Sequence, residues 1–348
     1  MHFVFLNGIA IRNEHNLSTI HHSHGAFEVG TAKIKRVALL TNPAAGKGSA
    51  SNAAQKAKQR LNQLGVDVVS IQGSSPESSR ELAAAMVADE RIDALVVAGG
   101  DGLIALALQE QAQSGKPLGI IPAGTGNDHA REYSIPTDPV NAAEVIADGF
   151  WTTSDLGIMR SYPHSTDITQ RELGDPLSTY WFGTIACAGF DSLVSDRTNQ
   201  ITWPKGRNRY NLAIVLEFLN FHSIPTTLVL DAGEESQRVI TTQATLCAMG
   251  VTRSYGGGMY ICPDADHHDG LLDITVMGRL SRTKAALKFR KIFTGDIRGE
   301  EGLDMYRTKR ARITMPNING YADGDKFAPL PMEVEAIPGA GKFLVPRP

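Results

Sequence analysis

Apolar residues in the first half of the chain alternate between short continuous runs and helical spacing. Four runs have the length of a buried strand, at residues 37–40, 66–71, 94–98 and 118–121. The stretches between them carry apolar residues three or four positions apart, at residues 53–64, 76–87 and 103–111. Strand and helix therefore alternate, and nearly continuous apolar strands are typical of a parallel sheet that helices cover on both faces.

The pattern changes after about residue 155, where β-branched and alternating segments predominate. Strands are expected at residues 179–188, 226–231, 241–249, 271–277, 311–315 and 332–337. Helical spacing returns at residues 210–218 and 281–293. These segments predict a second, largely antiparallel domain.

The chain has 348 residues, which is long for a single core, so two domains are the natural expectation. We place an α/β domain at residues 36–150 and the second domain at residues 151–337. Residues 1–35 are treated as an extension without regular structure. The tail at residues 338–348 is expected to pack back on the first domain.

Charge and cysteine content exclude several classes of protein. Thirty-four basic and 37 acidic residues leave a net charge of −3, which argues against nucleic-acid binding by bulk charge. The three cysteines have no CxxC spacing, which indicates reduced core residues in a cytoplasmic protein. No apolar stretch approaches the roughly 18 residues that suggest a membrane span. The chain is therefore expected to be cytoplasmic, or peripheral at the inner face of the membrane.

Two glycine-rich loops carry the strongest chemical signal. Gly99-Gly100-Asp101-Gly102 and the loop at residues 122–128 each follow a predicted strand. Glycine lets the backbone approach phosphate oxygens, and parallel strands send both loops, together with residues 42–48, to one edge of the sheet. Asp101 and Asp128 would repel a phosphate unless a divalent cation lay between them. The pattern therefore predicts metal-assisted phosphoryl transfer with Mg²⁺.

Other interpretations of these segments remain open on sequence grounds. Asp101 could cap its own helix, and Asp323-Gly324-Asp325 could be an ordinary turn. The basic, amphipathic stretch 279–293 could lie on an anionic bilayer or be a solvated surface helix. The first loop lacks the third glycine of a dinucleotide fingerprint, so a dehydrogenase is disfavoured.

The motifs together resemble the catalytic signature of the diacylglycerol kinase, sphingosine kinase and ceramide kinase superfamily. The matching segments are Asn42-Pro43-x-x-Gly46-x-Gly48, Gly99-Gly100-Asp101-Gly102, Pro122-x-Gly124-Thr125-Gly126-Asn127-Asp128-x-Ala130-Arg131, Gly189-Phe190-Asp191, residues 256–273, Asp323-Gly324-Asp325 and Ile337-Pro338-Gly339-Ala340. The chain is most similar to the bacterial soluble branch. The resemblance implies an α/β fold, with a parallel-sheet nucleotide-binding domain followed by a mostly antiparallel β-sandwich lipid domain.

The resemblance also implies roles for individual residues. The implied nucleotide contacts are Asn42, Pro43, Ala44, Ala45, Gly46, Gly99, Gly100, Asp101, Gly102, Leu103, Ile104, Ala105, Gly124, Thr125, Gly126 and Asn127. Asp101, Asp128 and Asp155 match magnesium-linked aspartates. Asp325 takes the place of the general base, and Asp325 and Asp101 are the expected catalytic residues. Asp191 would orient the substrate hydroxyl. A structural magnesium site would use the carboxylate of Asp269 and backbone oxygens of Asp266 and Leu271.

The expected activity is an ATP- and Mg²⁺-dependent lipid kinase acting on a diacylglycerol or sphingoid-type hydroxyl at a membrane surface. Two alternatives remain. A kinase for a soluble acceptor, similar to NAD kinase, would share the Gly99-Gly100-Asp101-Gly102 motif and a similar sheet. A nucleotide-binding regulator without catalysis is suggested by three departures from the family pattern, Leu103, Ala105 and Asp325 in place of glutamate. Peripheral membrane contact is expected and nucleic acid is not. A homodimer is one of the assemblies that the sequence leaves open.

Overall fold

The computed structural model describes residues 18–22, 25–42, 49–189, 223–278 and 291–348. The chain divides into two compact units. The first contains residues 1–156, 267–270 and 337–348, so the C-terminal tail belongs to it. The second contains residues 157–266 and 271–336.

A parallel sheet forms the centre of the first unit. Its strands β3 (Arg36–Thr41), β4 (Asp67–Gln72), β5 (Ala94–Gly99) and β6 (Leu118–Pro122) lie in the order β6-β5-β3-β4. All six residues of β5 and all five of β6 are buried, as their continuous apolar sequence predicts. The four predicted strands and their parallel pairing are confirmed.

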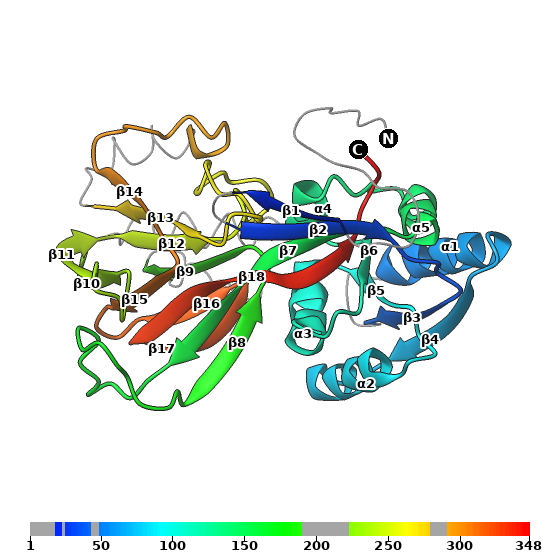
Figure 1. Ribbon diagram of the computed structural model, residues 1–348, viewed down its shortest axis with the longest axis horizontal. Coiled ribbons are helices and arrows are strands. Elements are labelled where there is room, and N and C mark those ends of the chain that lie inside the picture. The colour runs from blue at the N-terminus through cyan, green and yellow to red at the C-terminus, as the bar shows by residue number, and fades with distance from the viewer. Residues whose placement is uncertain (1–17, 23–24, 43–48, 190–222, 279–290) are drawn as a thin grey trace, which may run out of the picture. The chain divides into compact units, whose positions relative to one another are not determined.

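Helices cover both faces of this sheet. They are α1 (Ser49–Gln63), α2 (Pro76–Ala88), α3 (Asp101–Gln111), α4 (Asp128–Glu132) and α5 (Pro139–Asp148). Helix α1 packs against α5 on one face and α2 against α3 on the other (Figure 1). Ser75 caps α2 through a reciprocal pair of hydrogen bonds with Ser78, and Pro76 is the first helical residue. These residues therefore define the start of α2.

Further strands extend the sheet beyond β6. They are β1 (Ser18–His22), β2 (Gly25–Thr31), β7 (Phe150–Ser161) and β18 (Met332–Leu344), in the order β1-β2-β7-β18-β6. Residues 18–22 and 25–31 therefore form paired strands, and the expectation of an extension without regular structure is wrong for them. Neither β1 nor β2 has the long apolar run that marks the inner strands, because both lie toward the edge of the sheet.

The second unit is an antiparallel sandwich. One sheet contains β8 (Ser178–Phe182), β10 (Ile224–Leu230), β11 (Arg238–Ala244) and β15 (Arg310–Thr314), with parts of β7 and β18. The other has the order β14 (Leu303–Thr308), β13 (Leu272–Met277), β12 (Leu246–Gly250), β9 (Ile185–Gly189), β16 (Asn319–Ala322) and β17 (Asp325–Pro329). Buried residues from both sheets, among them Phe182, Met249 and Val334, form one core.

Two predicted strands each prove to be two strands in different sheets. The segment 179–188 divides into β8 and β9, and the segment 241–249 into β11 and β12. At the first break the carboxylate of Asp323 accepts hydrogen bonds from the backbone N–H groups of Gly183 (2.8 Å) and Thr184 (2.9 Å). The prediction of continuous strands is therefore wrong, because β-forming residues are found on both sides of each change of sheet.

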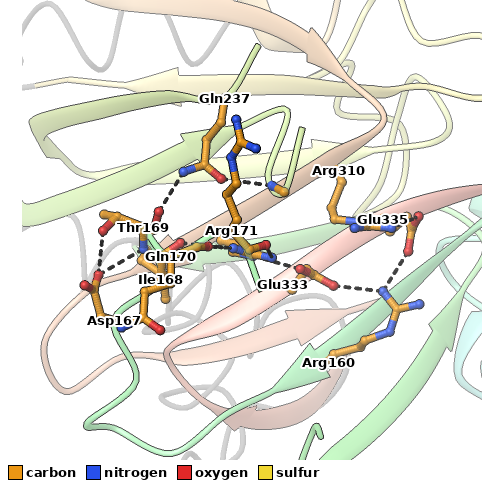
Figure 2. A network of polar contacts seen from close by, with 12 residues as sticks. Arg160, Asp167, Ile168, Thr169, Gln170, Arg171, Gln237, Arg310, Glu333 and Glu335 are labelled. Atoms are coloured by element: carbon orange, nitrogen blue, oxygen red, sulfur yellow. Dashed lines mark hydrogen bonds and ion pairs between the residues drawn. The ribbon is translucent and has the colours of Figure 1, made fainter. Parts of the chain in front are cut away.

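A buried ion-pair network lies on the face of β15 and β18 that points away from this core (Figure 2). Arg160 Nη1 reaches both Glu333 (3.1 Å) and Glu335 (2.8 Å). Arg312 Nε pairs with Glu333 at 2.8 Å, and Arg310 Nη2 pairs with Glu335 at 2.7 Å. The Arg312 guanidinium also donates to backbone carbonyls in the segment between β7 and β8 (residues 162–177), which fastens that segment to the sheet.

Among the described residues, no helix is long and apolar enough to cross a membrane. The basic stretch at residues 279–290 lies outside the described part of the chain. The three cysteines are buried and form no disulfide, and burial raises the pKa of Cys247 to about 12. These thiols are therefore core residues.

The network makes a prediction about stability. Replacing Arg312 by methionine removes one partner of a buried pair and three donors to the 162–177 segment, so the free energy of unfolding should fall by about 3–5 kcal/mol. Arg238→Met is the control, because that side chain is 60% exposed and its nitrogen lies 3.9 Å from Asp231, and it should cost at most about 1 kcal/mol. Urea denaturation measures both. Equal losses for the two variants would contradict the structural role of the network.

Candidate functional site

The candidate site lies at the carboxyl ends of the parallel strands in the first unit. Strands β3 and β5 are neighbours, and their helices α1 and α3 go to opposite faces of the sheet. Open α/β sheets bind their ligands where the connections part in this way. Asn42, directly after β3, is half-buried. The implied nucleotide contacts Pro43, Ala44, Ala45 and Gly46 lie outside the described residues.

The two glycine-rich loops touch each other through their backbones. A Cβ added to Gly124 would lie 2.5 Å from the Cα of Gly100, and one added to Gly100 would lie 3.0 Å from the Cα of Gly124. Ala123 N–H donates to the carbonyl of Gly99 at 2.9 Å. No other residue type allows this approach without displacing one loop. The predicted convergence of these two loops is confirmed.

Asp101 is the first residue of α3 and does not cap it. The N-cap is Gly100, which supplies no side-chain bond. The Asp101 carboxylate instead accepts hydrogen bonds from the backbone N–H and the Nδ1 of His129, both at 3.2 Å. Burial favours the neutral acid, but the hydrogen bonds and charge of His129 outweigh it and hold the pKa of Asp101 below its usual value. This carboxylate is therefore ionised and anchored to the second loop.

The second loop is braced by its own side chains. Asn127 has a left-handed backbone, with φ 52°, and its Oδ1 accepts the N–H of Gly124 at 3.0 Å. Asp128 is buried and forms an ion pair with Arg131, which also donates to the carbonyl of Gly126 at 2.8 Å. Thr125 remains exposed between these contacts. The loop thus presents the hydroxyl-bearing side chain of Thr125 and main-chain groups on a fixed frame.

Three of the implied nucleotide contacts face the protein interior. Leu103, Ile104 and Ala105 are buried in α3, and the side chain of Leu103 packs against Gly99. Their side chains therefore contribute to the core, and contact with a nucleotide at this position would fall to the exposed backbone of Gly102.

Asp155 connects three segments that are distant in sequence. It is buried on β7, and its two oxygens accept the N–H groups of Gly270 (2.6 Å) and Gly339 (2.9 Å). Burial raises the pKa of this carboxyl above its usual value, and the two backbone hydrogen bonds oppose the shift only in part. The contacts identify Asp155 as the residue that fixes the loop at residues 267–270 and the C-terminal tail to the first unit.

The region implied as a structural magnesium site has a mixed set of groups. Asp266 is exposed, and Asp269 and Leu271 are half-buried. In the described part of the chain, the consecutive residues Asp266, His267 and His268 form a group with ligand atoms within 4.8 Å of one another. However, His267 Nδ1 lies 3.1 Å from Glu132 and His268 Nε2 lies 3.0 Å from the carbonyl of Thr153, so both histidines already have protein partners.

In the second unit, Asp323 and Asp325 have different environments. Asp323 and Gly324 both have positive φ, 50° and 88°, as in the two-residue turn that joins β16 to β17. Asp325 is exposed at the start of β17, and the Tyr180 hydroxyl donates to its Oδ2 at 3.3 Å. Desolvation by surrounding protein atoms and the nearby charge of Asp323 raise the pKa of Asp325, while the Tyr180 hydrogen bond acts against the shift. Asp191 lies outside the described residues.

No role was predicted for His129 from the sequence. This residue stands between Asp128 and Ala130 in the second motif, and its side chain is fully buried against Asp101. The only signal in the sequence is a histidine beside a predicted metal ligand, which is weak without the fold.

Comparison with known proteins identifies related chains along most of the sequence. Residues 36–159 match the diacylglycerol kinase catalytic domain, and residues 184–345 match the YegS C-terminal NAD kinase beta sandwich-like domain. A protein named diacylglycerol kinase from Mycobacterium tuberculosis (strain ATCC 25618 / H37Rv) is 46% identical over 316 residues, which cover 90% of this chain and 96% of that protein. Another of that name, from Staphylococcus saprophyticus, is 27% identical, covering 70% of this chain and 73% of that protein.

Solved structures show the same fold. The crystal structure of a diacylglycerol kinase from Bacillus anthracis str. Sterne aligns with a TM-score of 0.65 at 18% identity, over 90% of this chain and 98% of that one. A second crystal structure from that organism aligns over the same shares with a TM-score of 0.71 at 20% identity. Given the relative at 46% identity and the two matching domains, the chain belongs to the diacylglycerol kinase family of lipid kinases.

Proposed function

We propose that this lipid kinase transfers the γ-phosphoryl group of ATP to the hydroxyl of diacylglycerol, with Mg²⁺ as cofactor. The observation that carries the proposal is the backbone contact between Gly100 and Gly124, with the ionised Asp101 beside it. Main-chain N–H groups at the start of an uncapped helix suit phosphate oxygens. An anionic side chain at the same place suits a cation bound between protein and phosphate.

The residues present fit a magnesium ion at this position in part. Asp101 and Asp128 supply hard carboxylate oxygens from two loops that meet, which is the donor type that magnesium prefers. Asp155 fits less directly, because each of its oxygens already accepts a backbone N–H. Its contribution would be limited to remaining lone pairs or a bridging water. We therefore assign Asp101 and Asp128 as the magnesium-linked carboxylates, and Asp155 as a residue that supports them through the loop and tail that it holds.

The chain's own residues have three tasks in the proposed reaction. The glycine loops, with Thr125 and Asn127, hold the phosphates; when bound, magnesium would offset the charge that develops on them. Asp325 accepts the proton of the lipid hydroxyl as the hydroxyl oxygen attacks the γ-phosphorus atom of ATP. The raised pKa of Asp325 supports this task, because a carboxylate with a higher proton affinity is a stronger base. Asp191 would orient the same hydroxyl.

The choice of acceptor rests on the relatives. The two curated relatives described above carry the name diacylglycerol kinase, and one of them shares 46% identity with this chain. This favours a lipid over the soluble acceptor of an NAD kinase-like enzyme, and family membership disfavours a regulator without catalysis. The changes at Leu103 and Ala105 do not weaken the proposal, because both side chains are buried.

The first test is the reaction itself. Purified protein with ATP and Mg²⁺ should phosphorylate diacylglycerol in mixed micelles, and sphingosine, ceramide and NAD offered in parallel should be poorer acceptors. Removal of the metal with EDTA should abolish turnover, and added Mg²⁺ should restore it. Labelled phosphate in each product is measured after separation. Transfer to NAD alone would reject the lipid assignment, and full activity in EDTA would reject the role of the metal.

A second test concerns the base. Asp325→Asn keeps the shape of the side chain but removes its ability to take a proton, so kcat should fall about 10²–10⁴-fold with unchanged ATP binding. Asp304→Asn is the matched control, since Asp304 is an exposed aspartate of the same unit, and its kcat should remain at the wild-type level. Steady-state kinetics and calorimetry provide the two readouts. An Asp325→Asn enzyme with wild-type kcat would assign the base to another residue.

A third test concerns the contact between the loops. Gly124→Ala places a Cβ 2.5 Å from the Cα of Gly100, so the loops must move apart, and a displacement of this size should lower kcat/KM for ATP on the order of 100-fold. Gly174→Ala is the control, because a Cβ there meets nothing within 4 Å. Kinetics with varied ATP measure the effect. If both alanine variants bind and use ATP normally, the loop contact is not the phosphate site.

A further inference from the structure

His129 makes an unusual pair of contacts for a histidine inside a short helix. Its side chain is fully buried, and both its backbone N–H and its Nδ1 lie 3.2 Å from the same oxygen of Asp101. An ionised carboxylate can only accept hydrogen bonds, so Nδ1 carries the proton in this contact. His129, which follows the second glycine-rich loop, therefore holds the carboxylate of Asp101, in the first loop, through two hydrogen bonds.

We propose that His129 is a positioning residue that sets the orientation of the Asp101 carboxylate toward magnesium, and this inference rests on the proposed function above. An aspartate at the start of a helix can rotate about χ1 and χ2, and only some orientations direct its second oxygen toward a ligand. The two bonds to Oδ1 fix that oxygen. The position of Oδ2 is then determined by the planar carboxylate group.

The position of His129 in the fold explains why it can act in this way. It follows Asp128, the other proposed magnesium-linked carboxylate, and the backbone N–H of Asp128 also lowers the pKa of Asp101. The start of α4 is thus tied to the start of α3 through one carboxylate. Any shift of one loop relative to the other would stretch the bonds to His129, so the residue couples the two carboxylates.

A simpler role for His129 is to fill space in the core of the first unit. The two roles predict different behaviour, because packing depends on the size of the side chain whereas positioning depends on a donor at Nδ1. The amide nitrogen of asparagine is attached to Cγ, as Nδ1 is, so His129→Asn retains the donor while it reduces the packing. His129→Leu fills much of the space and removes the donor. All variants keep the backbone N–H.

The experiment compares His129→Leu, His129→Asn and His129→Gln, in which the amide lies one bond further from Cα. Tyr133→Phe is the matched control, because Tyr133 is buried at the end of α4 and the change removes its hydrogen bond with Ser154 while it keeps the ring. For each protein, calorimetry gives the magnesium dependence of binding of a non-hydrolysable ATP analogue. Kinetics give kcat, the KM for diacylglycerol and the magnesium concentration for half-maximal activity. Thermal unfolding without ligands measures the packing effect.

The expected result is a selective change in the response to magnesium. His129→Leu and His129→Gln should require about 10–100-fold more magnesium, as is typical when a residue supporting a metal ligand is removed, with an unchanged KM for the lipid. His129→Asn should stay within about threefold of wild type even if its thermal stability falls, since the donor is retained. Tyr133→Phe should lower only the unfolding temperature.

Three outcomes would overturn the inference. Magnesium dependence that follows thermal stability across all four variants, including Tyr133→Phe, would show a packing role. An unchanged magnesium response in both His129→Leu and His129→Gln would show that the donor is not needed. If the wild-type protein itself shows no magnesium-dependent nucleotide binding, the proposed function fails and this inference fails with it. The measurement on the wild-type protein distinguishes this outcome from the other two.

Discussion

The close approach of Gly100 and Gly124 is the constraint on which the rest of the site depends. Strands β5 and β6 are parallel neighbours with Gly99 opposite Pro122, so the loops that follow them leave the same edge in register. Two ordinary side chains at these positions would keep the loops apart. With glycine at both, Asp101 of one loop comes within hydrogen-bond reach of α4, which follows the other loop. The ionised state of Asp101 and its bonds to His129 follow from that approach.

The parallel half of the fold could be predicted because its signals are local. A strand such as β5 is apolar throughout since it is buried on both faces, and the start of a helix is marked by a residue such as Ser75. The antiparallel sandwich was harder to predict. Residues 179–188 are rich in β-forming residues on both sides of Gly183, yet the chain changes sheet after Phe182, where the carboxylate of Asp323, 140 residues away, accepts the N–H group of Gly183. A hydrogen bond between residues so far apart cannot be inferred from the pattern of residues within one segment.

Contacts between distant segments also limit what the sequence can predict about the functional residues. The glycine motifs located the loops, since the requirement for glycine is a property of the backbone alone. The task of each aspartate could not be read in this way. Asp155 and Asp323 both accept backbone N–H groups, and their partners Gly270, Gly339 and Gly183 come from remote segments. What a carboxylate does depends on the donors around it, which only the fold supplies.

The pKa values of Asp101 and Asp325 shift in opposite directions, which agrees with the different tasks proposed for them. Burial alone would raise the pKa of Asp101, but its bonds to His129 and the charge of that residue reverse the shift, so the group keeps its negative charge, as the proposed link to a cation requires. At Asp325 desolvation and the charge of Asp323 prevail over the single bond from Tyr180, so its proton affinity is higher. A group with the higher affinity is the better acceptor for the proton of an alcohol. In the proposed phosphoryl transfer, these different neighbours would suit Asp101 to a cation and Asp325 to the proton of the alcohol.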